Sequence, residues 1–591
     1  MKKNLALALL SICMLVGCGG GGLSGNSSNN QSSAPTPDPT YNPQNAKYGE
    51  WTTSPTKMPI NPIHAALLHT GKILVISGSG NCPPQQTGCA QGPQYAQGAA
   101  LFDLSNNNIH IFPTNWDMFC NGMSIMQDGR VLIQGGTKRY GALAVVGATG
   151  DIPFLGFPNA TIFDPSSESF GDIAATAHGR WYPTLTELND GRMMTTAGLN
   201  DSDGNNNNTS EIWNGQEWSA EIAGNPNIPD FPGFQFPLYP RMHLLPTGHI
   251  FYSAPSSAAL DFDPSTQTWK LVAWTIYPGL HDPNGERTYG TSVLLPLTPQ
   301  NNYSPKVMIM GGDNPATNTT ELIDLSPAGM NISASCPNYA PCWVQGPAMA
   351  EARVEMEATI LPNGKLLVDG GSAEDEDAKT ASLKAEIYDP ATNKFSSAGS
   401  NAFARLYHNT QLLLPDGTVF LSGGNPAQGV FENHIEIYQP SYLFNSDGSP
   451  AKRPTAPSNA PASITFGQAF TLSTPDAATI GSIALIKAGS VTHSFDMDQR
   501  YVGLSFTTGE GSLKVTAPPN SNIAPPGYYM LFLVNKAGTP SLASWVQVSG
   551  AAAPIAKVEL HPERVPTPSY IFQRKHVTES PLPLRKEMHI H

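Results

Sequence analysis

The sequence is poor in charged residues and in cysteine. Charged side chains make up 13% of its 591 residues, and the net charge of −14 argues against nucleic acid binding, which requires basic patches. Almost no stretch outside the N-terminal leader has helical periodicity, whereas 55 glycines and 54 prolines supply many turns. These features favour a large all-β protein whose partner is a small molecule or a neutral polymer.

The N-terminus has the parts of an export signal: two lysines, an apolar run and a small residue before the cleavage point. Leu15-Val16-Gly17-Cys18 has the form of a bacterial lipobox, in which the cysteine is lipidated and becomes the new N-terminus. An ordinary cleaved signal is the alternative. We expect residues 1–18 to be a lipoprotein-type signal peptide and residues 19–45 to be a flexible tether. The chain would then be an exported lipoprotein of the cell envelope or cell surface, held to a membrane only by acyl chains.

Only seven cysteines are present, and two of them lie in the leader. Cys82 and Cys89 form one closely spaced pair, and Cys336 and Cys342 form another. Disulfides persist outside the cytosol, so both pairs are candidate loop-closing bridges. A metal site is the weaker alternative, because no further cysteine or histidine completes a ligand set nearby. Cys120 has no obvious cysteine partner.

One unit recurs seven times along the chain: a strand, a tight turn, an apolar strand and a pair of small residues. Asp-Gly and Asn-Gly between apolar runs are the strongest short-range signal for a hairpin. The turn glycines recur every 53 to 62 residues, with one interval of 116 that spans an irregular fifth copy: Gly71, Gly129, Gly191, Gly248, Gly364 and Gly417. A repeating β unit of this length is typical of a kelch-like propeller. We predict a seven-bladed β-propeller over residues 46–445.

The pattern changes after the last repeat. Residues 454–550 contain short alternating strands, which predict a small immunoglobulin-like β-sandwich. Residues 551–591 are irregular and rich in proline, and we expect a disordered tail.

Four motifs carry residues with redox or metal-binding chemistry. They are Asp117-Met-Phe-Cys120-Asn-Gly, Arg180-Trp-Tyr182-Pro, Ala404-Arg-Leu-Tyr407-His408 and Thr492-His493-Ser-Phe-Asp-Met-Asp-Gln-Arg500. The first three begin a repeat, and the fourth lies in the sandwich segment. Four such motifs in this order, on seven repeats with an appended sandwich, resemble the copper radical oxidases, the family of galactose oxidase and glyoxal oxidase. The second motif is closer to the glyoxal oxidase pattern.

The resemblance implies a role for each residue. Cys120 matches the cysteine that the family joins to a tyrosine by a thioether, and Tyr182 matches that tyrosine. Tyr407 matches the axial tyrosine ligand, and His408 and His493 match the two histidine ligands. Imidazole and phenolate suit Cu²⁺. Taking two electrons from an alcohol needs two one-electron stores, which copper and the Cys120–Tyr182 radical would supply.

The reaction implied by the resemblance converts small aldehydes or primary alcohols with O₂ to an oxidised product and hydrogen peroxide. Tyr407 would accept the substrate proton, and the Tyr182 radical would abstract hydrogen from the adjacent carbon. His493 would reach the channel from the sandwich, so the second domain would complete the site. We expect the protein to act as a monomer.

The sequence departs from galactose oxidase at two places. Galactose oxidase stacks a tryptophan over the thioether, and here Asn200, or else Leu199, stands at that position. A polar amide shields a radical poorly, so we expect a less persistent or higher-potential radical. The acidic run Glu374–Asp377 follows Gly370-Gly371. If it faces the copper it should disfavour carboxylate substrates, and a solvated loop is the alternative reading.

The main alternative function is a non-catalytic propeller that binds envelope or matrix glycans or proteins. A glycan hydrolase is a third possibility, but no suitable carboxylate pair stands at these motifs. The intact set of five residues favours the oxidase. The remaining histidines have no such context, and we interpret them as structural: His64, His69, His178, His243 and His281.

Overall fold

The computed structural model describes residues 41–78, 98–139, 153–224, 233–277, 286–326, 343–374, 376–427 and 430–549. The chain divides into two compact units, residues 1–41 and 42–591, and every element below belongs to the second. The predicted signal peptide with Cys18, most of the tether, both cysteine pairs, His281 and the tail lie outside the described residues. Within those residues, no helix is long and apolar enough to cross a bilayer.

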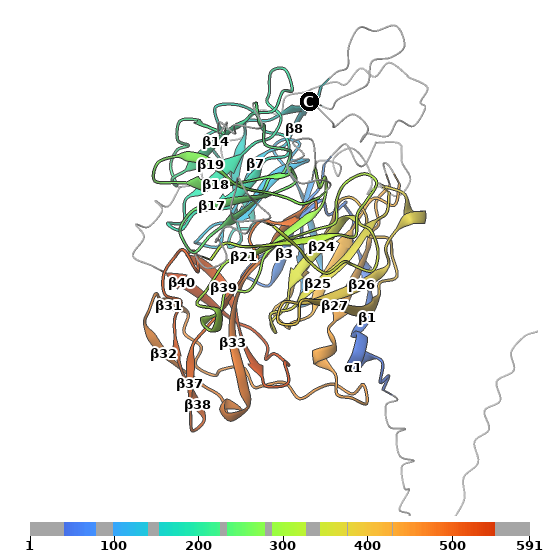
Figure 1. The fold of residues 1–591 in the computed structure, drawn as a ribbon, viewed down its shortest axis with the longest axis vertical. Helices are drawn as coiled ribbons and strands as arrows, with labels where there is room; N and C mark the ends of the chain where they lie inside the picture. The colour runs from blue at the N-terminus through green and yellow to red at the C-terminus, as the bar shows by residue number, and fades with distance from the viewer. Residues whose placement is uncertain are drawn as a thin grey trace, which may run out of the picture. The chain divides into compact units, whose positions relative to one another are not determined.

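The described chain is built almost entirely of antiparallel β-sheets, and its α-helix is the four-residue α1 (Asn45–Tyr48). Seven sheets contain four consecutive blade strands each, and they confirm the predicted all-β class (Figure 1). Blades 1 to 3 contain β2 (His64–Leu67), β3 (Lys72–Ile76), β4 (Gly98–Asp103) and β5 (Ile109–Pro113); β6 (Asn121–Ile125), β7 (Val131–Gly135), β10 (Ala160–Asp164) and β11 (Ser169–Ile173); and β12 (Thr184–Glu187), β13 (Met193–Thr196), β14 (Thr209–Trp213) and β15 (Ile222–Ala223). A separate pair is β8 (Thr137–Arg139) with β9 (Leu155–Gly156).

The other four blades follow the same order. Blades 4 and 5 contain β16 (Arg241–Leu244), β17 (Ile250–Ala254), β18 (Ala258–Asp263) and β19 (Thr268–Trp274); and β20 (Thr291–Leu294), β21 (Lys306–Met310), β22 (Thr320–Asp324) and β23 (Val344–Gln345). Blades 6 and 7 contain β24 (Val354–Ile360), β25 (Leu366–Ser372), β26 (Lys384–Asp389) and β27 (Lys394–Ser400); and β28 (Asn409–Leu413), β29 (Val419–Gly423), β30 (His434–Gln439) and β1 (Glu50–Lys57).

All seven predicted hairpins form, because the first two strands of every blade pair antiparallel. The first strand of each blade contacts the first strand of the next, and β28 of blade 7 contacts β2 of blade 1. These innermost strands are buried on both faces, except that His243 of β16 is partly exposed. The result is the seven-blade arrangement that the repeats predict.

Strand β1 supplies the outer strand of blade 7 by pairing with β30, so Trp51 lies opposite Tyr438. The N-terminal segment and the last blade are thereby joined, although almost 390 residues separate them in sequence. The repeat pattern did not predict this pairing.

The C-terminal segment forms two sheets of its own (Figure 1). One sheet has the order β31-β40-β39-β33-β36 and the other has β32-β38-β37. The strands are β31 (Ser463–Thr465), β32 (Ala469–Ser473), β33 (Ile480–Lys487), β36 (Arg500–Gly503), β37 (Phe506–Gly509), β38 (Ser512–Thr516), β39 (Gly527–Asn535) and β40 (Ser544–Ser549). These two sheets fit the short alternating strands predicted for residues 454–550.

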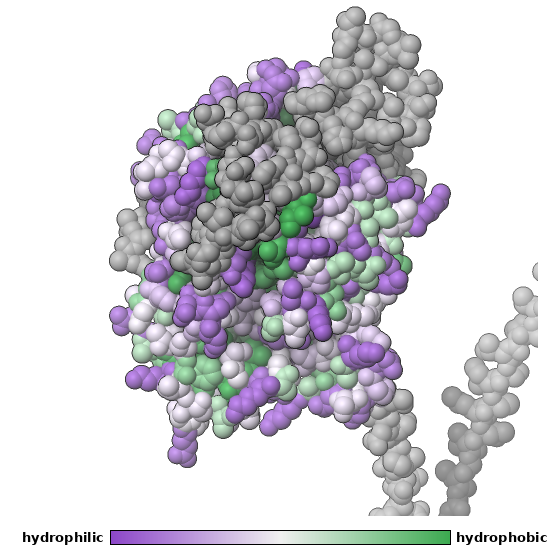
Figure 2. Space-filling view, in the orientation of Figure 1, coloured by the Kyte–Doolittle hydropathy of each residue, from purple (hydrophilic) through white to green (hydrophobic). Residues whose placement is uncertain are grey.

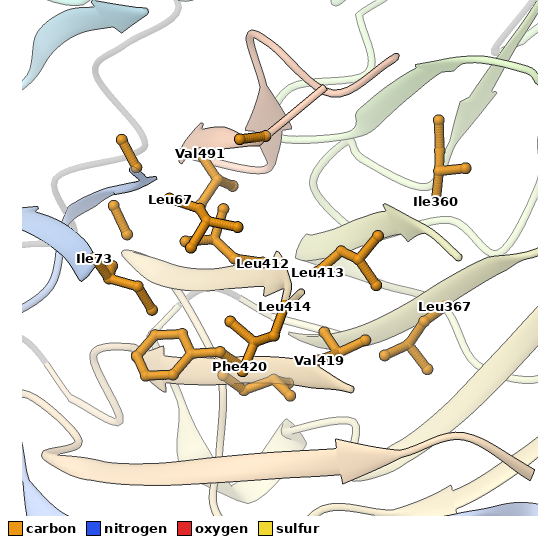
Figure 3. Close-up of a cluster of buried hydrophobic side chains, with 14 of the residues drawn as sticks. Leu67, Ile73, Ile360, Leu367, Leu412, Leu413, Leu414, Val419, Phe420 and Val491 are labelled. Carbon is orange, nitrogen blue, oxygen red and sulfur yellow. The ribbon is translucent and has the colours of Figure 1, made fainter. Parts of the chain in front are cut away.

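The segment that carries His493 belongs to neither of these sheets. Strands β34 (Ser490–Thr492) and β35 (Phe495–Asp496) form a hairpin that pairs with β2 and extends the sheet of blade 1 at its inner edge. Val491 of β34 packs beside Leu67 and Leu412, which come from blades 1 and 7 (Figure 3). The C-terminal segment therefore reaches the propeller channel by inserting a hairpin, rather than by presenting an edge of its sandwich.

On the face shown in Figure 2, the described residues mix hydrophilic and pale side chains with small hydrophobic areas. Among the described residues, the large hydrophobic side chains that are exposed lie far apart in the sequence, and most of them lie between the strands: Tyr41, Ile276, Val344, Leu383, Val430 and Leu542. Scattered exposed apolar residues are normal for a soluble domain.

Candidate metal centre

A buried arginine stands just before the first strand of blades 3, 5, 6 and 7. Each guanidinium pairs with a buried glutamate on the third strand of its own blade: Arg180–Glu211 (2.9 Å), Arg287–Glu321 (2.6 Å), Arg353–Glu386 (3.1 Å) and Arg405–Glu436 (2.8 Å). The pairing compensates two charges that could not otherwise be buried. The repeated pair fixes the path of the chain where it enters the channel.

The glycine pairs at the ends of the second strands form the joints between blades. The amide of Gly371 donates to the Arg405 carbonyl of the next blade at 2.6 Å. A Cβ on Gly370, whose φ is +71°, would lie 2.7 Å from the same oxygen. Gly312 makes the equivalent bond to Arg353, at 2.8 Å. Only glycine permits this close approach of two backbones, and the joint holds each buried arginine against the preceding blade.

Residues at the entrance of six successive blades have a left-handed backbone. They are Cys120 (φ +61°), Tyr182 (+68°), Tyr239 (+47°), Tyr289 (+54°), Glu355 (+65°) and His408 (+67°). Backbone bonds connect neighbours in this ring, with the amide of Tyr182 bonded to the Cys120 carbonyl and that of Tyr239 to the Tyr182 carbonyl, both at 2.9 Å. Such a backbone costs a non-glycine residue about 1–3 kcal/mol. Strain repeated at one ring marks it as the functional part of the channel.

A thiol and two imidazoles meet in this ring. Ligand atoms of Cys120, His408 and His493 all lie within 4.8 Å of one another, and all three residues are buried. The Sγ of Cys120 is 3.8 Å from Nε2 of His493. Cys120 carries a free thiol, and burial raises its pKa well above the usual value. Once it loses its proton, a thiol beside two imidazoles can bind a metal or form a covalent bond.

Both histidines are oriented by bonds to Nδ1. Asn425 Oδ1 lies 2.8 Å from Nδ1 of His408, and Thr492 Oγ1 lies 2.6 Å from Nδ1 of His493. A metal would therefore bind through Nε2 of each ring. Supports of this kind fix the ring and are part of a metal site.

Two buried charges hold the backbone around His493. Arg241 donates to the His493 carbonyl at 2.8 Å, and the amide of Ser494 donates to Glu357 at 3.0 Å. His493 and Ser494 have φ values of +46° and +66°. The propeller thus holds the inserted hairpin in a strained conformation that presents the imidazole to the channel.

Tyr182 and Tyr407 meet through their hydroxyl groups. Tyr182 is buried and Tyr407 is partly exposed. Burial is the main cause that raises the pKa of both phenols well above the usual value, so each keeps its proton unless a cation approaches. A metal ion reverses that preference and favours two phenolates.

This donor set fits copper. Two imidazoles and two phenols converge with a thiol next to one of the phenols, and Cu²⁺ takes imidazole and anionic oxygen ligands in tetragonal geometry. Cys120 and Tyr182 pack in one buried cluster. The structure thus brings together all five residues that the sequence singled out: Cys120, Tyr182, Tyr407, His408 and His493.

The side chain of Asn200 is bound within its own loop. Its Oδ1 accepts backbone amides of its own loop, including those of Ser202 and Asp203 at 3.0 Å. Of the two candidates it is Leu199 that packs in the cluster with Cys120 and Tyr182. The ring of Trp181 is centred 4.1 Å from that of Tyr182. Leu199 is the second residue offered for the stacking position, and the expected lifetime and potential of the radical stay a prediction.

Sequence reasoning missed three residues near the centre. His64, interpreted as structural, is fully buried with its ring 6.0 Å from that of His493, and neither ring nitrogen has a hydrogen-bond partner among the described residues. The ring of Tyr239 packs against those of both Tyr182 and His493, with centroids 4.5 and 4.6 Å apart, and the ring of Tyr289 is centred 5.4 Å from that of Tyr407. An isolated histidine or tyrosine stands in no sequence pattern that would identify it. Tyr289 could have been found, because it stands in an Arg-x-Tyr triplet that recurs along the chain.

The acidic run is attached to the rim of the cluster. The amide of Ala316, which packs against the cluster, bonds to the Ala373 carbonyl just before Glu374. The Glu374 side chain is exposed, Asp377 caps the short helix that follows, and Asp375 lies outside the described residues.

Two family models match the chain. "Glyoxal oxidase N-terminus" matches residues 70–442, and "Galactose oxidase-like, Early set domain" matches residues 453–548. The first covers the blades except β1 and β2, and the second covers the C-terminal sheets and the hairpin with His493.

Curated relatives carry related names. Galactose oxidase of Gibberella zeae is 28% identical over 460 residues, which are 74% of this chain and 61% of the relative. The chain therefore spans about three-fifths of that protein. Aldehyde oxidase GLOX of Vitis pseudoreticulata is 28% identical over 549 residues, which are 85% of this chain and 97% of the relative.

A solved structure shares the fold. It is a fungal alcohol oxidase of the AA5 family in complex with copper, with a TM-score of 0.68 and 23% identity, over 85% of this chain and all of that chain. The match of the first family model to more than half of the residues, together with the fold, shows that the chain belongs to the glyoxal oxidase N-terminus family, here followed by a galactose oxidase-like early set domain.

Proposed function

We propose that the chain is a copper-dependent oxidase that converts small aldehydes or primary alcohols with O₂ to an oxidised product and hydrogen peroxide. One observation carries the proposal: three blades and an inserted hairpin bring a thiol, two phenols and two imidazoles to one buried point. Relatives named galactose oxidase and aldehyde oxidase support the reaction class.

Copper would be held by Tyr182, Tyr407, His408 and His493. When bound, it would store one electron and offer a position for the substrate oxygen. The second electron would be stored by Tyr182, whose ring is easier to oxidise when a sulfur is attached to it. A bond between Cys120 Sγ and a Tyr182 ring carbon would form with loss of the S–H and C–H hydrogens to O₂.

In turnover, Tyr407 would take the proton from the substrate hydroxyl, and the Tyr182 radical would take a hydrogen atom from the adjacent carbon. An alcohol RCH₂OH and O₂ give RCHO and H₂O₂, and a hydrated aldehyde RCH(OH)₂ gives RCOOH and H₂O₂. Two electrons and two protons leave the substrate and appear in the peroxide.

The residues around the centre favour small, uncharged substrates. Phe154, Leu238 and Ala316 are partly buried apolar residues that pack against the site cluster. The acidic run beginning at Glu374 is tied to Ala316, and its negative field would oppose an approaching carboxylate. Turnover of glycolaldehyde or methylglyoxal should exceed that of glyoxylate, and the reverse order would contradict this assignment.

The function is tested by peroxide release from copper-loaded protein over a panel of small aldehydes and primary alcohols. Wild type should release peroxide, whereas Tyr182→Phe and Cys120→Ser should fall to background. Tyr388→Phe is a matched control, since Tyr388 is buried and bonds Asn393 away from the site. Copper-loaded wild type that releases no peroxide would favour a propeller that only binds envelope glycans or proteins.

We also infer that the chain is an exported lipoprotein that acts as a monomer. The lipobox ending in Cys18 and the tether-like composition after it support the anchor. Cys18→Ala should move the protein from the membrane fraction to the soluble fraction without changing specific activity. Unchanged membrane association would contradict the anchor.

A further inference from the structure

The motif that carries His493 also contains a carboxylate that has no role so far, Asp496. His493 stands in the turn between β34 and β35, which are three and two residues long. Two residue pairs join these strands. A two-stranded hairpin is at best marginally stable by itself, so this short one needs further support to hold an imidazole in a fixed direction.

One carboxylate oxygen of Asp496 closes the base of the hairpin. Its Oδ1 accepts the amide of Ser490, the first residue of β34, at 2.9 Å. The same oxygen accepts the amides of Asp498 and Gln499, which follow β35, at 3.0 and 2.9 Å. Three amide donors suit an anionic oxygen. Both ends of the hairpin are therefore joined at one atom.

The two residues that follow the hairpin are themselves fixed to blades. Asp498 accepts the Ile125 amide of blade 2 at 2.7 Å, and Gln499 accepts the Ile360 amide of blade 6 at 3.0 Å. These side chains place the backbone whose amides bind Asp496. The position of two blades is thus passed to the hairpin through the Asp496 oxygen.

The start of the hairpin is held to the strand that follows Cys120. This strand, β6, begins directly after Cys120. The Ser490 hydroxyl donates to the Met123 carbonyl of β6 at 2.7 Å. The base that Asp496 closes is therefore attached next to the thiol, whose Sγ lies 3.8 Å from Nε2 of His493.

The second oxygen of Asp496 is enclosed by the chain just before the hairpin. A Cβ added to Gly489 would collide with Oδ2 of Asp496. Since the φ of Gly489 is not left-handed, the close approach of the carboxylate is what favours glycine here. The Gly489 carbonyl accepts the Leu67 amide of blade 1 at 3.0 Å, so the enclosing backbone is fixed as well.

We propose that Asp496 is a positioning residue that closes the hairpin and so directs Nε2 of His493 toward the metal centre. The effect on copper rests on the proposed function, whereas the three amide bonds do not. Without the carboxylate the two arms would separate at their base, and the left-handed turn at His493 and Ser494 would relax. The imidazole would then lose the fixed direction that a metal ligand needs.

The first test is copper affinity by chelator competition. Asp496→Ala should bind copper about 10–100-fold more weakly, as is typical when a group that orients a ligand is lost. Asp496→Asn keeps an oxygen acceptor at the same place and should bind within about threefold of wild type. Asn535→Ala is the control, because Asn535 Oδ1 also accepts two amides, at 2.9 and 3.0 Å, but in a turn of the sandwich. Its copper affinity should equal that of wild type.

The EPR spectrum of the bound copper separates a change in ligand direction from a general loss of stability. Wild type and Asp496→Asn should show nitrogen coupling from two imidazoles, whereas Asp496→Ala should show coupling from one. Gly489→Ala would displace the same carboxylate without removing it and should give the spectrum of Asp496→Ala.

A second measurement needs neither copper nor a folded Asp496→Ala protein. Hydrogen exchange is compared between metal-free wild type and Asp496→Asn at the amides of Ser490, Asp498 and Gln499. A neutral acceptor binds an amide less strongly than an anionic one, so exchange at all three should be about tenfold faster in the variant. The Thr539 amide, which binds Asn535, should exchange at the same rate in both proteins.

Unchanged exchange at the three amides would overturn the proposal, as would an Asp496→Ala protein with the copper affinity and spectrum of wild type. An Asp496→Asn protein that binds copper as weakly as Asp496→Ala would also overturn it, because the charge and not the placed oxygen would then matter. Wild type that binds copper but releases no peroxide would refute the proposed function and leave the role of Asp496 to be decided by affinity, spectrum and exchange.

Discussion

The Arg405–Glu436 pair should be essential for placing Tyr407 and His408, and replacing Arg405 by Met tests this. The guanidinium contacts Glu436 at 2.8 and 3.1 Å, the Gly423 carbonyl at 2.9 Å and the His434 carbonyl at 3.0 Å. Arg405 is fully buried and Glu436 is 1% exposed. The substitution would leave a buried carboxylate with one remaining donor, the amide of Ala402 at 2.7 Å.

Removing one partner of a buried ion pair costs about 3–5 kcal/mol, because the other charge is left uncompensated. We expect Arg405→Met to lower the free energy of unfolding by that amount and to weaken copper binding as well. Replacing both partners, as Arg405→Met with Glu436→Leu, removes the buried charge. The double variant should therefore be more stable than Arg405→Met alone by about 1–3 kcal/mol.

The measurement is urea unfolding followed by tryptophan fluorescence, with an exposed pair as control. Lys306 and Asp324 are 3.2 Å apart but 50% and 33% exposed. Lys306→Met should cost less than about 1 kcal/mol. The reasoning fails if Arg405→Met is as mild as Lys306→Met, or if the double variant loses the sum of the single losses.

Three further predictions concern the core and the histidine supports. Burial raises the pKa of Asp369 to about 7 from 3.8, so the folded protein binds this proton more tightly than the unfolded chain does. Its stabilising effect is complete below pH 4 and is lost as pH rises through 7, by at most about 4 kcal/mol. The urea midpoint of wild type should therefore fall between pH 5 and pH 8, whereas that of Asp369→Asn should not fall in this way. An equal fall in both proteins would contradict the assignment. Asn425→Ala and Thr492→Val should each weaken copper binding by about 10–100-fold in chelator competition; unchanged affinity would show that the Nδ1 contacts do not orient the rings. Gly370→Ala should lower the melting temperature far more than Gly364→Ala, whose added Cβ would meet its nearest atom only at 3.8 Å; equal losses would show that the blade joint is not tight.

The blades could be predicted from sequence because their signals are local. A glycine turn between two apolar runs defines a hairpin within about 15 residues, and seven copies define the ring. The pairing of β1 with β30 joins segments almost 390 residues apart, so no local pattern contains it. The same holds for the β34–β35 hairpin, whose residues alternate like sandwich strands but pair with β2.

The site residues that stand in sequence motifs could be predicted, whereas the neighbours that are placed only by tertiary packing could not. Cys120, Tyr182, Tyr407, His408 and His493 each stand in a recognisable segment. The sequence left two adjacent residues, Asn200 and Leu199, as candidates for the neighbour of the Tyr182 ring; the side chain of Asn200 binds its own loop, and Leu199 packs in the cluster with Tyr182. His64 and Tyr289 lie near the centre because the blades form a ring, and the spacing of residues in the sequence does not show which residues that ring brings together.

The central claim is that Cys120 and Tyr182 form one covalent unit at a copper site. The direct measurement is the mass of the protein and of its proteolytic peptides after copper and O₂ are added to the reduced, metal-free chain. The account predicts a loss of two hydrogens and a single peptide pair containing Cys120 and Tyr182. Recovery of the two peptides separately, with a free Cys120 thiol in copper-loaded protein, would contradict it.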